Sequence, residues 1–296
     1  MNCLPVHVEP AASTLGATVT DFAATELSDS DFEDLYSAWL EHAVLIMPSQ
    51  GLSNDEHRSF TRRFGRLERG ISRSTTTGFA AISNVTAEGS VAEPESLQAR
   101  FLVGNTGWHT DSSYKRVSAK ASMLASHVAP SSGGDTEWAD MRAAHDALSA
   151  EDLRGLDGAV AVHSYRYSHA PFGGLEVASE HDLGFLPDVQ HPVLRTHPET
   201  GRRVLFVGRH ASHLIGENFD ESRALLQRLT SEGAQQPRLL KHHWNAGDLV
   251  IWDNRAVLHR GHPWPEGEAR HMVRTTVAGD DPDNEWAAPD ELQSAT

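Results

Sequence analysis

Cysteine and long apolar runs are the most informative absences in this sequence. Its 296 residues include one cysteine, Cys3, so no internal disulfide can form. The longest apolar runs, such as AVLIM at 43–47, are far too short to span a bilayer. The first ten residues, MNCLPVHVEP, have neither the cationic flank nor the apolar core of a secretion signal. These absences predict a cytoplasmic protein without a membrane-spanning segment.

Positive charge is also scarce. Lys and Arg number 25 against 41 Asp and Glu, the formal net charge is −16, and no basic run occurs. Nucleic acid and anionic membranes both select for basic surfaces, so we expect neither as a partner. An anionic small substrate would need arginine concentrated at its binding site to overcome the acidic background.

Linker-like segments are missing as well. No Pro-, Gly- or Ser-rich stretch divides the chain, so we expect a single domain over residues 1–296 with an acidic C-terminal tail from about 280.

Near the N-terminus, the spacings Ser30 to Glu33 and Ser53 to Glu56 match capping boxes and predict the starts of two helices.

Short strands dominate the rest of the sequence, and they show no regular alternation with helices. This pattern predicts a mainly β fold, a sandwich or barrel with helices packed outside it. The expected strands begin near residues 44, 79, 121, 159, 191, 203, 247 and 271. Helices are expected at about 140–155 and at 220–233, where Asp220 can cap. The polar stretches 71–107 and 164–190 are long enough to cover a site.

Candidate metal ligands occur in GNTGWHTDSSY, residues 104–114. In an extended segment His109 and Asp111 point to the same side and can hold adjacent positions on a metal. A second imidazole, His259, follows the strand and turn of GDLVIWDNRAVLHRG, where it is either a hydrogen-bonded rim residue or a third ligand. Together the three form a facial triad typical of non-haem Fe(II) sites. Zinc competes for such ligands, but a structural zinc site usually has four, including cysteine.

Four ordered motifs carry a family resemblance: WHTD at 108–111, GGDT at 133–136, WDNRAVLH at 252–259 and ARHMVRTTV at 269–277. In order and spacing they resemble the iron- and 2-oxoglutarate-dependent dioxygenases of the TauD/TfdA family, which act on taurine or 2,4-dichlorophenoxyacetate. The resemblance extends from GATVTDF near residue 16 to about residue 279. It implies a double-stranded β-helix, or jelly roll, with flanking helices.

The resemblance also implies roles for eight residues. The iron ligands would be His109, Asp111 and His259; the 2-oxoglutarate contacts Thr136 and Arg270; the substrate contacts Arg274, Asn105 and Ser112. A guanidinium with a hydroxyl donor suits the far carboxylate of 2-oxoglutarate. Because positions 270, 272 and 274 share one face of a strand, both arginines could point into the barrel.

The implied reaction is hydroxylation, with Fe(II) as cofactor, 2-oxoglutarate and O2 as cosubstrates, and succinate and CO2 as co-products. Retention of the carboxylate Asp111 favours hydroxylation over halogenation. The segments AISNV at 81–85, ADMRAAHDALS at 139–149 and THPETGRRVLFVGRHA at 196–211 are most similar to aryloxyalkanoate dioxygenases acting on phenoxypropionate-type acids. A small anionic carboxylate is therefore the expected substrate, and a sulfonate such as taurine is the alternative.

Two alternatives from other classes stay open at the level of sequence. A metal-dependent hydrolase could use the same His/Asp/His set to activate water, although Thr136 and Arg270 would then have no role. A jelly-roll binding protein without catalysis would need no iron. A serine hydrolase is disfavoured because no G-x-S-x-G motif occurs. For the assembly we expect a homo-oligomer.

Overall fold

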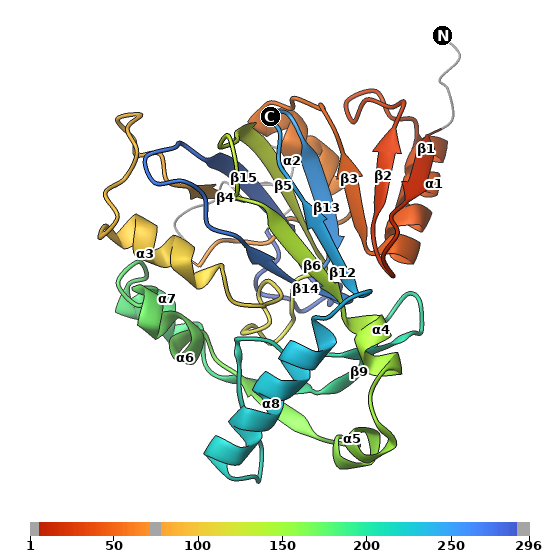
Figure 1. The fold of residues 1–296 in the computed structure, drawn as a ribbon, viewed down its shortest axis with the longest axis vertical. Helices are drawn as coiled ribbons and strands as arrows, with labels where there is room; N and C mark the ends of the chain where they lie inside the picture. Colours follow the sequence, from red (N-terminus) through yellow and green to blue (C-terminus); the bar gives the residue numbers. More distant parts are fainter. Residues whose placement is uncertain (1–5, 72–77, 289–296) are drawn as a thin grey trace.

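The computed structural model describes residues 6–71 and 78–288; residues 1–5, which include Cys3, 72–77 and 289–296 lie outside the described part. Its largest element is a seven-stranded sheet, visible across the upper half of Figure 1. In spatial order this sheet contains β1 (His7–Pro10), β2 (Ala17–Thr20), β3 (Val44–Met47), β13 (Leu249–Asp253), β5 (Ala121–Val128), β15 (His271–Val277) and β4 (Phe79–Ser83). All neighbours are antiparallel except β2 and β3.

A second, three-stranded sheet packs against the central strands of the first. It consists of β12 (Leu239–His242), β6 (Thr136–Asp140) and β14 (Val257–Gly261), all antiparallel. Buried side chains fill the space between the two sheets, among them Trp138 on β6, Trp252 on β13 and Leu124 on β5. Two facing sheets, antiparallel apart from the β2–β3 pair, with one apolar core between them form a jelly roll, so the predicted fold class is confirmed.

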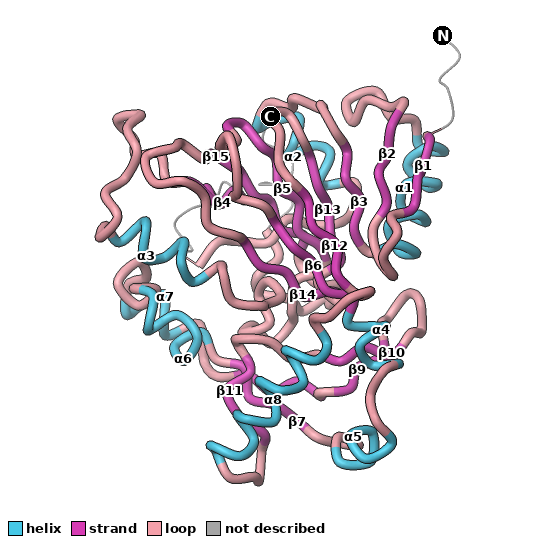
Figure 2. Tube along the Cα trace, viewed as in Figure 1, coloured by secondary structure: helices cyan, strands magenta, loops and turns pink. Residues whose placement is uncertain are grey.

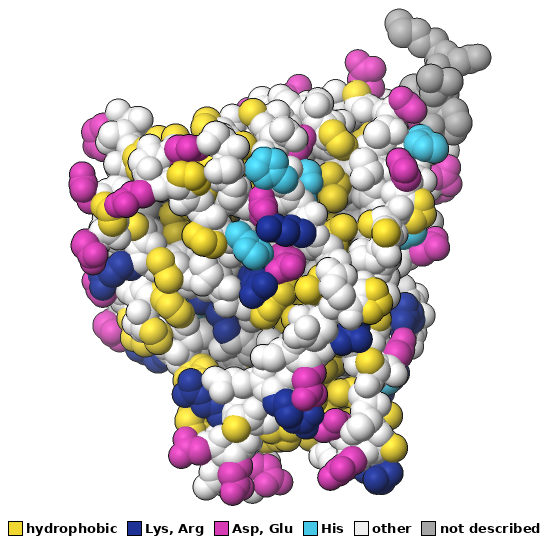
Figure 3. Space-filling view, in the orientation of Figure 1, with side chains coloured by type: hydrophobic (Ala, Val, Ile, Leu, Met, Phe, Trp, Pro, Cys, Tyr) yellow, Lys and Arg dark blue, Asp and Glu magenta, His cyan; other side chains and the backbone are white. Residues whose placement is uncertain are grey.

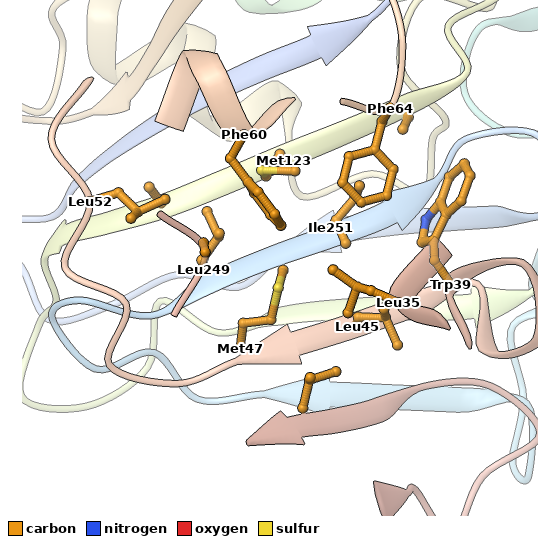
Figure 4. Packing of buried hydrophobic residues seen from close by; sticks show 14 of the residues in the cluster. Leu35, Trp39, Leu45, Met47, Leu52, Phe60, Phe64, Met123, Leu249 and Ile251 are labelled. Atoms are coloured by element: carbon orange, nitrogen blue, oxygen red, sulfur yellow. The ribbon is translucent and has the colours of Figure 1, made fainter. Parts of the chain in front are cut away.

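Two helices, α1 (Asp29–His42) and α2 (Asn54–Arg62), cover the other face of the large sheet. Figure 4 shows Trp39, Phe60 and Phe64 packed on sheet residues such as Met123 and Ile251. Burying each such side chain contributes roughly 1.5 to 3 kcal/mol. This layer of helices makes the large sheet rigid, so side chains on its inner face are held in fixed positions.

The predicted helix starts were right in one case and shifted in the other. Ser53 and Glu56 form the expected capping box at α2. At α1, however, Ser28 is the cap, because its hydroxyl accepts from the Asp31 amide, and Ser30 already lies inside the helix. Two serines lie two residues apart, and each is followed three residues later by an acidic residue, so the sequence does not distinguish them.

The chain between β6 and β12 forms the lower lobe of Figure 1. Its helices are α4 (Met141–Asp146), α5 (Ala150–Gly155), α6 (Tyr165–His169), the 3-10 turn η1 (Ala170–Phe172), α7 (Glu180–Gly184) and α8 (Phe219–Gly233). Its strands are β7 (Val160–His163), β8 (Val189–Pro192), β9 (Leu194–Thr196), β10 (Arg203–Leu205) and β11 (Ala211–Leu214). They form two small sheets, β11-β7-β8 and β10-β9.

Several boundaries in this lobe, and one helix before it, differ from the prediction. The single helix expected at 140–155 is two short helices, and the strand expected from residue 191 is interrupted at Val193. Asn218, not Asp220, caps α8. The stretches predicted as long loops contain helices, namely α3 (Leu97–Gly104), α6 and α7, as the cyan segments of Figure 2 show.

Part of the segment predicted as an acidic tail, up to residue 288, is packed against the rest of the protein. Trp286 is 2% exposed and packs with Tyr114 and Tyr165; residues 289–296 lie outside the description. Over the described residues, no helix has the length and apolar character needed to cross a membrane.

Candidate functional site

Backbone pairing brings two of the predicted ligands together. The amide of His109 donates to the carbonyl of His259 at 3.0 Å, and the amide of His259 donates back at 2.7 Å. Strand β14 thus places His259, and the WHTD segment lies antiparallel beside it. Asp111, two residues further, completes a buried group whose ligand atoms lie within 4.8 Å of one another. The described residues contribute three members to this group.

Both histidines are held as neutral imidazoles. His109 Nδ1 lies 2.7 Å from the Gly107 carbonyl; a carbonyl only accepts, so Nδ1 carries the proton and Nε2 keeps its lone pair. Burial, aided by neighbouring cations, holds the pKa of His109 well below its ordinary value and lowers the pKa of His259 to about 4. Neutral imidazole is the form that binds a metal.

Asp111 is held as a carboxylate. Burial alone would raise its pKa, but the Arg274 guanidinium and the Ser122 hydroxyl outweigh burial and lower it. Arg274 Nη1 donates to Oδ1 at 2.6 Å, and Ser122 Oγ donates to Oδ2 at 2.6 Å. Oδ2 lies 3.7 Å from His259 Nε2.

This donor set fits a divalent iron. Two neutral nitrogens and one carboxylate oxygen leave coordination positions open for other ligands, as non-haem Fe(II) oxygenases require. No cysteine occurs in the described residues, so a closed cysteine-containing zinc site is not formed there.

A cavity of about 300 Å³ opens beside the group, and His109 and His259 form part of its wall. Most of the remaining wall is apolar, and its polar groups are few. The residues used below are Ile82, Val91, Leu102, Asn105, Leu124, Thr136, Trp252, Trp264, Arg270 and Arg274. A concave apolar space with a few directed polar groups is the usual form of a small-molecule site.

Arg270 is a buried cation without a carboxylate partner. It is 4% exposed and forms no ion pair with any carboxylate of the described residues. Its Nε donates to the Gly134 carbonyl at 3.1 Å, and its guanidinium lies 5.3 Å from the Trp264 ring centre. Burial lowers the pKa of Arg270 to about 10. The side chain remains charged at neutral pH and can bind an anion in the cavity.

The GGDT motif provides room for that arginine and a hydroxyl beside it. Gly134 has φ +65°, and a Cβ there would lie 3.2 Å from Arg270 Nε, so glycine suits the position. Thr136 Oγ1 accepts from Trp244 Nε1 at 2.9 Å. An indole N–H only donates, so the threonine keeps its own proton to donate elsewhere.

Two of the three predicted substrate residues lie at the cavity and one does not. Arg274 and Asn105 line the cavity. Ser112 does not: it has φ +57°, and its hydroxyl donates to Glu68 Oε1 at 2.6 Å. Its left-handed backbone turns this side chain toward the Glu68–Lys115 ion pair, whose atoms lie 2.7 Å apart.

Three residues near the site were not anticipated. Trp244 and Trp264 contact the predicted cosubstrate residues, and no local pattern marks them. Arg209 lies close enough to the ligand group to lower the pKa of His109 and His259, and it donates to His169 Nε2 at 3.0 Å. For Arg209, the sequence offered only one signal, namely that an anionic substrate requires arginine near its binding site; for the two tryptophans it offered none.

Comparison with known proteins agrees with this geometry. The family model "Taurine catabolism dioxygenase TauD, TfdA family" matches residues 7–276. An (S)-phenoxypropionate/alpha-ketoglutarate-dioxygenase of Delftia acidovorans is 40% identical over 291 residues, 96% of this chain and 98% of that protein. A protein of the same name from Sphingobium herbicidovorans is 41% identical, with 92% and 95% covered.

A solved structure gives the same result in three dimensions. The crystal structure of AAD-2 in complex with Mn(II) and N-oxalylglycine superposes with a TM-score of 0.86 at 30% identity, covering 94% of this chain and 98% of that one. These matches decide against the hydrolase and the non-catalytic binding protein. The chain belongs to the TauD/TfdA family and is a 2-oxoglutarate-dependent dioxygenase.

Proposed function

We propose that this dioxygenase hydroxylates a small aryloxyalkanoate-type carboxylic acid, with His109, Asp111 and His259 as its iron ligands. The observation that carries the proposal is one cavity that has the ligand group in its wall and two arginines beside it. Fe(II), with 2-oxoglutarate and O2, supplies the oxidising chemistry, and succinate and CO2 are the co-products.

Arg270 and Thr136 are the proposed binding residues for the far carboxylate of 2-oxoglutarate. The terminal nitrogens of Arg270 can donate two parallel hydrogen bonds to a carboxylate, and the free Thr136 proton can supply a third. Because Arg270 is buried and Trp264 lies against its guanidinium, its orientation is set before the ligand arrives.

Arg274 and Asn105 are the proposed substrate contacts. Arg274 is 23% exposed and lines the cavity, so its charge can attract an anionic substrate while one of its nitrogens stays on Asp111. The apolar wall around Leu102 and Val91 suits an aryl ring better than the short, polar chain of taurine. The substrates named for the two curated relatives agree with a ring-bearing carboxylate.

Substrate-stimulated succinate release tests the proposal. Anaerobically loaded Fe(II) protein receives 2-oxoglutarate and O2 together with (R)- or (S)-phenoxypropionate, phenoxyacetate or taurine. We expect succinate release to rise most with an aryloxy acid, together with phenol, because hydroxylation beside the ether oxygen gives an unstable hemiacetal. Stronger stimulation by taurine would replace the carboxylate with a sulfonate, and stimulation by none would refute the substrate class.

Four further expectations accompany this function. The family match over residues 7–276 supports a single catalytic domain. On the face shown in Figure 3, Lys and Arg are interspersed with Asp and Glu, which supports a small molecule over nucleic acid or an anionic membrane as the partner. Cytoplasmic location and a homo-oligomeric state stay predictions, which cell fractionation and light scattering can check.

A further inference from the structure

Asn254 lies in the turn between β13 and β14 and is 1% exposed. Its side-chain amide has four partners nearby. Oδ1 lies 3.0 Å from Trp252 Nε1, 3.2 Å from the Asp111 amide and 3.3 Å from Thr110 Oγ1, while Nδ2 lies 2.9 Å from Ser122 Oγ. One buried amide thus joins the turn that precedes His259 to the segment that carries Asp111.

Chemistry alone sets the direction of these bonds. The Trp252 indole and the Asp111 amide can only donate, so the oxygen of Asn254 must face them. Its nitrogen then faces Ser122 and donates to it. A serine hydroxyl that accepts there directs its one proton elsewhere, and the Asp111 Oδ2 atom is 2.6 Å away.

The end of this relay is the carboxylate oxygen that faces the second histidine. Asp111 Oδ2 accepts the Ser122 proton and lies 3.7 Å from His259 Nε2. Thr110 Oγ1 donates to the main-chain carbonyl of Asn254 at 2.7 Å, which ties the backbone before Asp111 to the same turn. Both the main chain and the carboxylate of Asp111 are therefore oriented from one residue.

We propose that Asn254 is a positioning residue that sets the Asp111 carboxylate for metal binding, acting through Ser122 and through its own hydrogen bond with the Asp111 amide. The inference rests on the proposed metal site. Ser122 lies on β5 and Asn254 follows β13, two strands paired in the firm sheet, so the relay starts from rigid backbone. Groups that orient metal ligands commonly contribute ten- to a hundredfold to metal affinity.

A purely structural asparagine would behave differently. Removing any buried, hydrogen-bonded amide costs stability, whether or not it positions a ligand. Asn284 offers a matched control because it is 6% exposed, donates to the Gly279 carbonyl at 3.0 Å and accepts from the Trp286 amide at 3.1 Å. Metal affinity of the folded protein separates the two roles.

The experiment measures Mn(II) affinity by isothermal titration calorimetry and thermal unfolding of metal-free protein. We expect Asn254→Ala to weaken Mn(II) binding about ten- to a hundredfold, whereas Asn284→Ala lowers the melting temperature with Mn(II) affinity within about twofold of wild type. Ser122→Ala should weaken binding less, and the double variant should match Asn254→Ala, because the serine proton is directed by the amide.

The outcomes separate the inference from the function on which it rests. Wild-type Mn(II) affinity in folded Asn254→Ala overturns the positioning role. If Asn254→Ala does not fold, Ser122→Ala decides, since it leaves the amide and its backbone anchors intact; unchanged Mn(II) affinity in this variant overturns the relay. A His109→Ala variant is the reference: Mn(II) affinity equal to wild type there would refute the proposed metal site itself.

Discussion

The two sides of the cavity are built in different ways. On the metal side, His109, Asp111 and His259 are all buried, and paired backbone or converging side-chain hydrogen bonds support them. On the substrate side, the wall comes from α3, the preceding turns and residues 262–267, and Val103 there is 53% exposed. The proposed metal ligands are thus held by buried, hydrogen-bonded backbone, whereas much of the apolar wall that faces the substrate comes from surface segments.

The difference follows from what each side must do. Metal ligands work only within a narrow geometry, so their support has to be rigid. A substrate wall needs mainly shape, and few bonds hold its segment 262–268: Trp264 Nε1 donates to the Glu268 carbonyl, and Asn84 Nδ2 donates to the same oxygen. We therefore expect changes on the metal side to abolish function and changes on the wall to redirect it.

Removal of a metal ligand should have the largest effect. His109→Ala and His259→Ala each remove one of three ligands, so turnover should fall more than a hundredfold, beyond the usual loss for supporting groups. Succinate release and Mn(II) affinity measure it. His243→Ala, which removes an exposed imidazole paired with Asp135, is the control. Near-normal turnover in either ligand variant would remove that histidine from the site.

Arg270→Ala should follow in size. Truncating one partner of a buried charge pair costs roughly 2 to 5 kcal/mol, so the KM for 2-oxoglutarate should rise about thirtyfold or more. Arg270→Lys should recover only part, because an ammonium cannot form the two-pronged contact. Arg202→Ala, on an exposed ion pair with Asp146, serves as control. An unchanged KM would contradict the assignment.

Arg274→Ala should affect the substrate and not the cosubstrate. The KM for the aryloxy acid should rise, and more succinate should be released per hydroxylated product, because misplacement by about 1 Å can cost on the order of a hundredfold in productive rate. Because Arg274 also donates to Asp111, this variant changes a contact on the metal side as well as one on the substrate side. Should the 2-oxoglutarate KM rise while the substrate KM stays constant, the roles of Arg270 and Arg274 are exchanged.

Leu102→Trp tests the wall directly. A larger ring in a cavity of about 300 Å³ should weaken binding of aryloxy acids by about tenfold or more. Mn(II) and 2-oxoglutarate binding should stay as in wild type, since Leu102 is neither a proposed metal ligand nor a proposed 2-oxoglutarate contact. Ile215→Trp, at an exposed aliphatic residue on the lower lobe, should leave all three constants unchanged. Parallel losses of all three in Leu102→Trp would break the comparison between the two sides.

The strands and ligands of the metal side could also be predicted from the sequence. The strands expected at 79–83, 121–128 and 271–277 match β4, β5 and β15, because β-branched and apolar runs of this length favour strands. His109, Asp111 and His259 stand in short motifs whose spacing carries geometry. The pairing of WHTD with β14 explains why a local pattern was sufficient to bring them together.

Other features depend on contacts that sequence does not display. Trp244 reaches Thr136 from 108 residues away, and Asn254 reaches Ser122 from 132 residues away. Ser112 was expected in the pocket, but a positive φ turned it toward Glu68. Helix α3 was taken for loop, since only eight residues support it and its packing is tertiary. Such placements follow from the assembled fold and not from periodicity.

His191 should produce the smallest effect, and it concerns stability on the metal side. Its Nε2 lies 2.9 Å from the Ser113 carbonyl and 3.1 Å from the Lys115 carbonyl, so it carries a proton there and anchors the chain just after Asp111. Burial, and then the Arg195 charge, lower its pKa to about 4, against about 6.5 in an unfolded chain. Between these values the unfolded state binds one proton more than the folded state. The free energy of unfolding therefore falls as pH drops from about 6.5 to 4, by up to about 1.4 kcal/mol per pH unit from this group.

His191→Gln keeps an N–H donor and removes the titration, so the stability of this variant should fall less steeply than that of wild type as the pH drops. Urea unfolding of metal-free protein at pH 7, 6 and 5 measures the slope, and an unchanged m-value shows that the same surface is exposed. Parallel pH curves for the variant and wild type would mean that His191 is protonated in the folded protein, and that its hold on the segment after Asp111 does not depend on a neutral ring.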